Sequence, residues 1–253
     1  MLKKEEIAYK DIEKAIDSLE FKSITLIPRA CVVGIDTTYF SKRFGVTIFR
    51  DVTNGKTLYW NFVVKENINP YVRGIEYLER SGITILGFVV DGFWGFFVRY
   101  GNKYPIQMCQ KHMKDIVRRY ITNKPKLQAS KELKEILKPL INLSKATFNN
   151  KFDNWLDKWR EFLKEKTYNE ENHKWVYTHD KLRKAVGSLI RYRHYLFTYE
   201  KNNWIPNTNN SIEGFNSSLK GFIGLHRGLR GDRKAKLIHE YLRMDSKFNW
   251  GEK

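Results

Sequence analysis

The chain has 253 residues, of which 42% are hydrophobic and 15% aromatic, so it can build a core and is not an intrinsically disordered composition. Its net charge is +18, because 46 Lys and Arg residues outnumber 28 Asp and Glu residues. The positive charge is interleaved with aromatic and Asn residues. This pattern favours a nucleic acid partner over the alternative, a basic protein without a specific partner.

Two cysteines, Cys31 and Cys109, exclude a disulfide framework and fit a reducing compartment. Residues 1–20 mix Lys, Glu and Asp and contain no apolar stretch, so we expect no signal peptide. The most apolar segment, residues 82–98, carries Asp91 in its middle and is interrupted by glycines. It is also shorter than the roughly 20 residues of a membrane span. We therefore expect no membrane partner.

The first half of the chain predicts an α/β structure. Short runs rich in β-branched and aromatic residues predict strands at 31–36, 45–52, 57–64, 83–90 and 104–109. Helices are expected at 1–21, 70–80 and 93–100. The dipeptide Asn54-Gly55 separates the second and third strands and is a strong hairpin signal.

From about residue 112 to residue 199 the apolar residues have helical spacing, which predicts several helices and no strand. Trp155 and Trp159 share a stripe with other apolar residues, so we expect both in a core; Trp175 could be core or a DNA-facing platform. A polar loop at 201–210 leads into a last amphipathic helix. The apolar face of that helix is predicted by Ile212, Phe215, Leu219 and Phe222.

Three acids stand out in this arrangement. Asp36 and Asp91 each end an apolar strand, and Glu213 lies in the first turn of the last helix. Carboxylates that met at the rim of a sheet would need cations, and hard oxygen ligands suit Mg²⁺ or Mn²⁺. Two such ions, about 3.5–4 Å apart, can clamp a phosphodiester. Alternatively, the two aspartates are turn residues, and Glu213 forms a capping box with Asn210.

Four segments carry a resemblance to a known family. They are Gly34-Ile35-Asp36-Thr37-Thr38-Tyr39, Val89-Val90-Asp91-Gly92, Cys109-Gln110-Lys111-His112 and Asn209-Asn210-Ser211-Ile212-Glu213-Gly214-Phe215-Asn216. In this order the set resembles the catalytic domain of DDE transposases of bacterial insertion sequences, in the group related to the Mutator elements. The resemblance covers about residues 30–240.

The resemblance implies a ribonuclease-H-like mixed sheet flanked by helices, with an all-helical insertion before the last acid. The chain would then comprise an N-terminal helical segment (1–29), the first part of the catalytic core (30–113), the insertion (114–204), and the last part of the core with a basic C-terminal segment (205–253). It also implies a two-metal site made by Asp36, Asp91 and Glu213. The family's Cys-x-x-His element falls on Cys109 and His112, for which we expect a structural or supporting role.

By the same resemblance, the substrates are DNA element ends and target DNA, the active complex is a homo-oligomer, and the protein is cytoplasmic in a bacterium or archaeon. Phosphate contacts are expected from Asn216, Lys220, Arg227, Arg230, Arg233 and Lys234. Only about 30 residues precede the first catalytic strand, whereas such transposases usually carry a separate N-terminal DNA-binding region. This favours one alternative, a catalytically unused DNA-binding protein derived from a transposase. A second alternative is a nuclease of the same fold, whose chemistry at the three acids would be identical.

Overall fold

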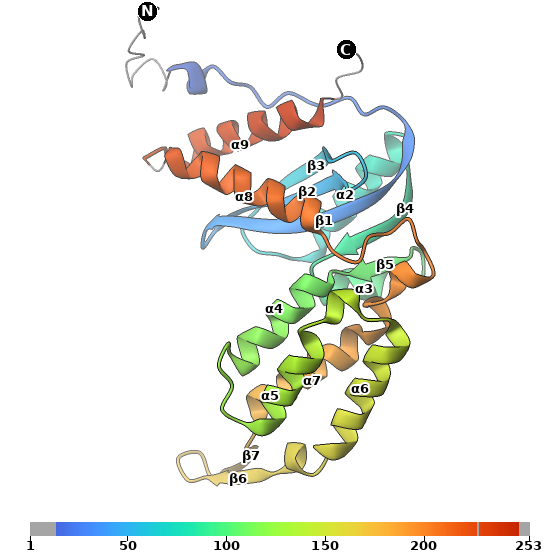
Figure 1. Cartoon of the computed structure of the whole chain (residues 1–253). Helices are drawn as coiled ribbons and strands as arrows, with labels where there is room; N and C mark the ends of the chain where they lie inside the picture. The colour runs from blue at the N-terminus through green and yellow to red at the C-terminus, as the bar shows by residue number, and fades with distance from the viewer. Residues whose placement is uncertain (1–13, 227, 248–253) are drawn as a thin grey trace, which may run out of the picture. The chain divides into compact units, whose positions relative to one another are not determined.

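The computed structural model describes residues 14–226 and 228–247 (Figure 1). It is an α/β structure with a mixed five-stranded sheet, in the order β3-β2-β1-β4-β5, flanked by helices. This architecture is compatible with the expected ribonuclease-H-like fold. The chain forms two compact units, residues 1–86 with 210–253 (unit 1) and residues 87–209 (unit 2).

Unit 1 begins with an antiparallel meander of β1 (Arg29–Ser41), β2 (Phe44–Asp51) and β3 (Lys56–Val63). The predicted hairpin between β2 and β3 is confirmed, and Gly55 in its turn has a φ of 63°, which favours glycine. One expectation was wrong: Asp36 does not end its strand. The apolar run stops there, but β1 continues because the following residues keep pairing with β2.

Helices cover both faces of this meander. On one face lies α2 (Ile68–Arg80), which begins after the N-cap Asn67. Gly74 lets α2 approach closely, since a Cβ at that position would lie 2.2 Å from the ring of Phe49. Unit 1 also contains the first half of β4 (Ile83–Val90), whose predicted span is confirmed.

The other face is covered by α8 (Asn210–Leu225) and α9 (Gly231–Ser246), which lie side by side over the strands (Figure 1). Their buried residues pack on Val46 and Ile48 of β2. Burying one such aliphatic side chain contributes about 1.5–3 kcal/mol. The helix side contributes Ile212, Leu219, Ile223, Ile238 and Leu242.

Unit 2 is mainly helical. Its α-helices are α3 (Trp94–Tyr100), α4 (Gln110–Ile121), α5 (Gln128–Leu137), α6 (Lys145–Lys158) and α7 (Asp180–Tyr192). Its 3₁₀ turns are Leu140–Asn142, Phe162–Lys164, Arg193–Tyr195 and Thr198–Glu200. The short strand β5 (Ile106–Met108) pairs in parallel with the end of β4. The segment 114–204, singled out by the sequence, lies wholly inside this unit.

The expectation of an all-helical insertion was wrong at one place. Residues 166–177 form an antiparallel hairpin of β6 (Lys166–Asn169) and β7 (Lys174–Tyr177). The hairpin buries no face, and Trp175 is 66% exposed. Trp155 is a core residue, as predicted, and Trp159 is half-buried with its indole N–H donating to Glu132. Among the described residues, no helix has the length and apolar composition needed to cross a bilayer.

Candidate active site

Asp36 lies in the middle of β1, on the face that α8 covers. In the β1–β2 ladder it pairs with Ile48, a member of the core beneath α8 and α9, and paired residues share a face. The Asp36 carboxylate is half-buried, and its Oδ2 accepts a hydrogen bond from Asn216 Nδ2 at 2.6 Å. Hydrogen bonds to an ionised carboxylate are shorter and stronger than neutral ones. This contact therefore holds α8 against Asp36.

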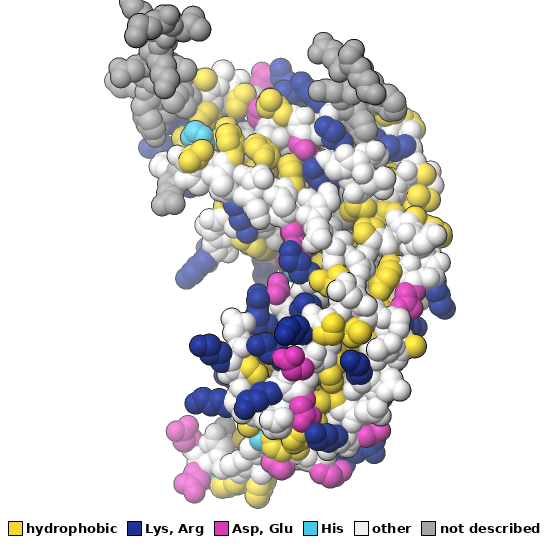
Figure 2. All heavy atoms as spheres, viewed as in Figure 1, with side chains coloured by type: hydrophobic (Ala, Val, Ile, Leu, Met, Phe, Trp, Pro, Cys, Tyr) yellow, Lys and Arg dark blue, Asp and Glu magenta, His cyan; other side chains and the backbone are white. Residues whose placement is uncertain are grey.

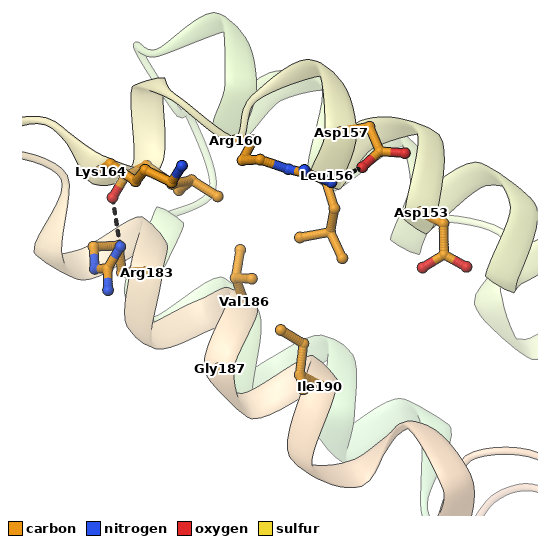
Figure 3. Close-up of a pocket in the computed structure, with 10 residues that line it drawn as sticks. Asp153, Leu156, Asp157, Arg160, Lys164, Arg183, Val186, Gly187 and Ile190 are labelled. Carbon is orange, nitrogen blue, oxygen red and sulfur yellow. Dashed lines mark hydrogen bonds and ion pairs between the residues drawn. The ribbon is translucent and has the colours of Figure 1, made fainter.

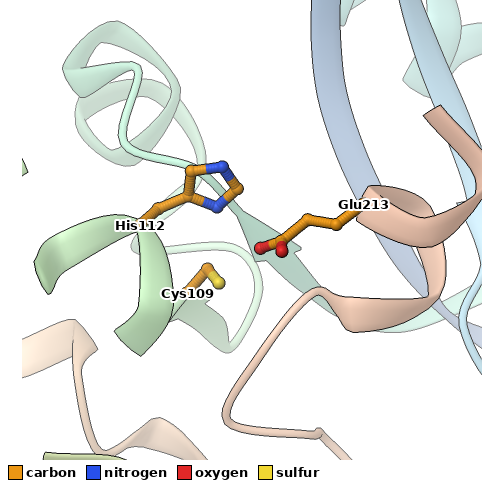
Figure 4. A group of neighbouring side chains, drawn as sticks. All are labelled: Cys109, His112 and Glu213. Carbon is orange, nitrogen blue, oxygen red and sulfur yellow. The ribbon is translucent and has the colours of Figure 1, made fainter. Parts of the chain in front are cut away.

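Helix α8 carries Glu213, Asn216 and Lys220 along one side. Asn216 is 5% exposed, whereas Glu213 is half-buried and Lys220 exposed. Glu213 leaves the first turn of α8 (Figure 4), three residues before Asn216. The capping-box alternative requires Asn210 to precede the helix. In the structure α8 begins at Asn210, one residue earlier than the box would place the first helical residue.

A further acid, Glu66, is influenced by the charge of Asp36 and was not singled out from the sequence. Glu66 lies half-buried in the loop between β3 and α2, and its carboxylate accepts a hydrogen bond from the Tyr71 hydroxyl. Burial raises the pKa of Glu66 above its ordinary value, the Tyr71 hydrogen bond lowers it, and the charge of Asp36 raises it. The sequence offered no signal for it beyond an acid directly before Asn67, the cap of α2.

Unit 2 brings Asp91, Cys109 and His112 together. Asp91 directly follows β4, as predicted, and Cys109 is the N-cap of α4. A ring nitrogen of His112 lies within 4.8 Å of a carboxylate oxygen of Asp91, and one also lies within 4.8 Å of the Cys109 Sγ. Figure 4 shows the Cys109 and His112 side chains. Cys109 is fully buried, and its Sγ accepts a hydrogen bond from the backbone N–H of Asn209 at 3.3 Å. Such a contact fits a structural role for the thiol.

The residue before α8 is anchored to the same part of unit 2. Asn209 is fully buried, and its side-chain Nδ2 also donates to the Val89 carbonyl at 3.4 Å. Val89 is the penultimate residue of β4 and precedes Asp91 by two residues. Asn209 therefore ties the approach to α8 to the end of β4.

The predicted phosphate-binding residues differ in their surroundings. Lys220 and Arg230 are exposed, and Lys234 is half-buried on α9. Arg233 forms an ion pair with Asp17, with Nη2 and Oδ2 2.7 Å apart. Arg227 lies outside the described residues. The Asp17 pairing means that a phosphate would have to replace a carboxylate at Arg233. Within residues 14–226 and 228–247, Lys220 and Arg230 form no such ion pair.

A hollow of about 650 Å³ lies elsewhere in unit 2, between α6 and α7 (Figure 3). Its walls mix apolar side chains such as Leu156 and Val186 with charged ones. Its two acids are already paired, Asp153 with Arg193 and Asp157 with Arg160. None of the candidate residues from the sequence lines it.

Comparison with known proteins adds no assignment. No family model matches the chain, and no curated protein matches it. The case for a function therefore depends on the residues and contacts described above.

Proposed function

We propose that the chain is a metal-dependent DNA transposase whose catalytic carboxylates are Asp36, Asp91 and Glu213. The observation that carries the proposal is the hydrogen bond from Asn216 to Asp36. It joins residues 180 positions apart and puts the acidic end of α8 against the strand that bears Asp36. A helix that served only to cover the core would not need a buried amide directed at a carboxylate.

Chain connectivity limits how far Glu213 can lie from Asn209. Asn209 contacts Val89 at the end of β4, and Glu213 follows Asn209 by four residues. Consecutive Cα atoms are about 3.8 Å apart, so the Cα of Glu213 stays within about 15 Å of that of Asn209. The helical conformation of the intervening residues shortens this distance further.

The surroundings of Asp36 fit a divalent cation. Asn216 Oδ1 is buried and, among the described residues, has no hydrogen-bond partner. Carboxylate and amide oxygens are the ligands that Mg²⁺ and Mn²⁺ prefer. In the proposal Asp36, Asp91 and Glu213 hold two such ions. When bound, Mg²⁺ polarises the phosphodiester and makes its water more acidic.

The protein's own residues orient the reactants. Asn216 fixes the Asp36 carboxylate, and Lys220 and Arg230 hold phosphates beside the bond to be broken. In the first step, water attacks the phosphorus at an element end and a 3′-hydroxyl leaves. In the second, that 3′-hydroxyl attacks a phosphodiester of target DNA and displaces its 3′-oxygen. We infer that a homo-oligomer holds the element ends and the target together.

The test replaces each acid by its amide and measures cleavage and binding separately. The substrate is a duplex containing the DNA that flanks the reading frame, with Mg²⁺ or Mn²⁺ added. We expect Asp36→Asn, Asp91→Asn and Glu213→Gln to abolish cleavage while DNA affinity holds or rises, because each change removes one negative charge. Asp157→Asn, an exposed acid on α6, is the matched control and should cleave normally.

Three results would overturn the proposal. Full cleavage by any of the three variants would exclude its residue from the catalytic set. Cleavage by the unaltered protein without joining of the 3′ end to target DNA would identify a nuclease of the same fold instead. A protein that binds DNA but cleaves nothing with either metal would be the catalytically unused derivative.

A further inference from the structure

Four cationic side chains of unit 2 line a groove between two of its helices. Lys114 and Arg118 belong to α4, Lys134 lies on α5, and Lys138 follows directly as its C-cap. The groove has a volume of about 160 Å³. We call it the α4–α5 groove. Its apolar floor is closed by Val117, Ile121 and Leu137, all at most 7% exposed.

Two of the four cations are held in place by backbone carbonyls. Lys114 Nζ donates to the carbonyl of Lys138 at 2.9 Å, and Lys134 Nζ donates to that of Asn123 at 2.7 Å. An ammonium group has three donors, so each of these lysines keeps two donors for a ligand. Each helix side also carries its pair of cations four residues apart, a rise of about 6 Å. The groove therefore presents two short rows of positive charge.

Two of the three acids in this region do little to cancel the charge of the groove. Asp115 forms an ion pair with Arg118 at 2.9 Å, and both side chains are about half exposed. Ion pairs at the surface contribute little to stability, so a phosphate can take the place of Asp115 at Arg118. Glu132 is engaged on another side, by Lys158 and Trp159, which lower its pKa to about 2.

Residues 111–138 together carry nine Lys or Arg and three Asp or Glu. Figure 2 shows dark blue side chains gathered on the face over α4 and α5. The excess of positive charge in the sequence is thus partly concentrated at this groove, away from the C-terminal residues that the sequence singled out.

We propose that the α4–α5 groove binds the sugar-phosphate backbone of double-stranded DNA without regard to base sequence. Rows of cations with free donors complement a line of phosphates. A membrane surface would also need exposed apolar side chains for insertion, and the apolar residues of the groove are its buried floor. The site does not include the carboxylates, so it goes beyond the proposed catalytic function and does not depend on it.

The test uses the full chain and a duplex of arbitrary sequence in EDTA, so that no cleavage contributes. The double variant Lys134→Ala, Lys138→Ala should lose two phosphate contacts. The slope of log affinity against log salt should then fall by about 1.8, since each contact contributes about 0.9. At 0.1 M salt this corresponds to a DNA affinity about eightfold lower for each lost contact, or about 60-fold lower for the double variant. The matched control is Lys145→Ala, Lys151→Ala on α6, which removes the same charge outside the groove.

The control should keep a slope close to that of the unaltered chain. An equal loss of slope in both variants would show that only net charge matters, and it would overturn the proposal. An unchanged slope in the groove variant would also overturn it. If the groove substitutions weaken binding to phosphatidylserine vesicles but not to DNA, the groove is a membrane site and the proposal is wrong.

Circular dichroism checks that each variant is folded. Should the double variant unfold, Lys138→Glu replaces it and is expected to weaken DNA binding by at least the single-contact amount.

Discussion

Replacing Asn216 by Asp tests both the packing of α8 and the presence of a metal site at Asp36. The two side chains have nearly the same shape, but the substitution turns a donor 2.6 Å from the Asp36 carboxylate into a second carboxylate. The lost charge-assisted hydrogen bond is worth about 1.5–3 kcal/mol. Two like charges that relax to about 4 Å repel by about 4 kcal/mol at an effective dielectric constant of 20. In EDTA at neutral pH we expect the free energy of unfolding to fall by the sum of the two, about 5.5–7 kcal/mol.

Divalent cations should reverse most of this loss. If Asp36 binds Mg²⁺, an added carboxylate beside it strengthens the site, and the ion removes the repulsion. The assay is urea unfolding followed by tryptophan fluorescence, in EDTA and in Mg²⁺. The Mg²⁺-induced rise in the unfolding midpoint should be larger for Asn216→Asp than for the unaltered chain.

Two controls separate charge from shape. Ser217→Asp adds the same charge at the next, exposed position of α8 and should change the free energy of unfolding by less than about 0.5 kcal/mol. Asn216→Leu removes the hydrogen bond without adding charge, so it should lose about 2 kcal/mol with or without Mg²⁺. Full stability of Asn216→Asp in EDTA would refute the contact with Asp36. A Mg²⁺ response no larger than that of the unaltered chain would refute metal binding there.

Two further predictions concern the packing of α9. Burial against aromatic rings, Trp60 among them, lowers the pKa of His239 below its ordinary value of 6.5. The unfolded chain then binds the proton first, so the free energy of unfolding should fall as pH drops below about 6.5, and His239→Phe should remove that dependence in a urea titration series. Asp245 accepts hydrogen bonds from Arg50 Nη1 at 2.6 Å and Thr57 N at 2.8 Å. Asp245→Asn should lower the free energy of unfolding by about 2–3 kcal/mol. Breaking a fully buried ion pair costs about 3–5 kcal/mol, and the loss here is smaller because the Asp245 side chain is 21% exposed.

Elements with a local signal were predicted well from the sequence. Asn54-Gly55 specified the β2–β3 hairpin because the turn needs a residue with positive φ. The extent of β1 was missed for a physical reason. The apolar pattern reports the continuous run of buried residues, which ends before the half-buried Asp36, but strand length is set by the ladder with β2.

The hairpin of β6 and β7 was missed because it has no buried face. Strands of four residues that are exposed on both sides show no alternation of apolar and polar residues. Their stability comes instead from local contacts, such as the Arg183 guanidinium 3.5 Å from the centre of the Tyr177 ring. Such contacts produce no periodic pattern of apolar residues in the sequence.

The candidate site was predictable only in its parts. Asp36, Glu213 and Asn216 could be chosen by type and by spacing along one helix, but the hydrogen bond between Asp36 and Asn216 could not. Asn216 was expected to hold a phosphate, and it instead lies buried and directed at the carboxylate. The influence of Asp36 on Glu66 likewise arises from tertiary structure.

The division of the chain into units has a consequence for synthesis. Unit 2 is one continuous segment, whereas unit 1 is completed only by residues 210–253. When residue 209 has left the ribosome, all of unit 2 is available to fold, but the meander still lacks α8 and α9 over Val46 and Ile48. At about 5–20 residues per second, the missing segment takes several seconds to follow. The hydrogen bond between Asp36 and Asn216 therefore forms only after α8 has been synthesised.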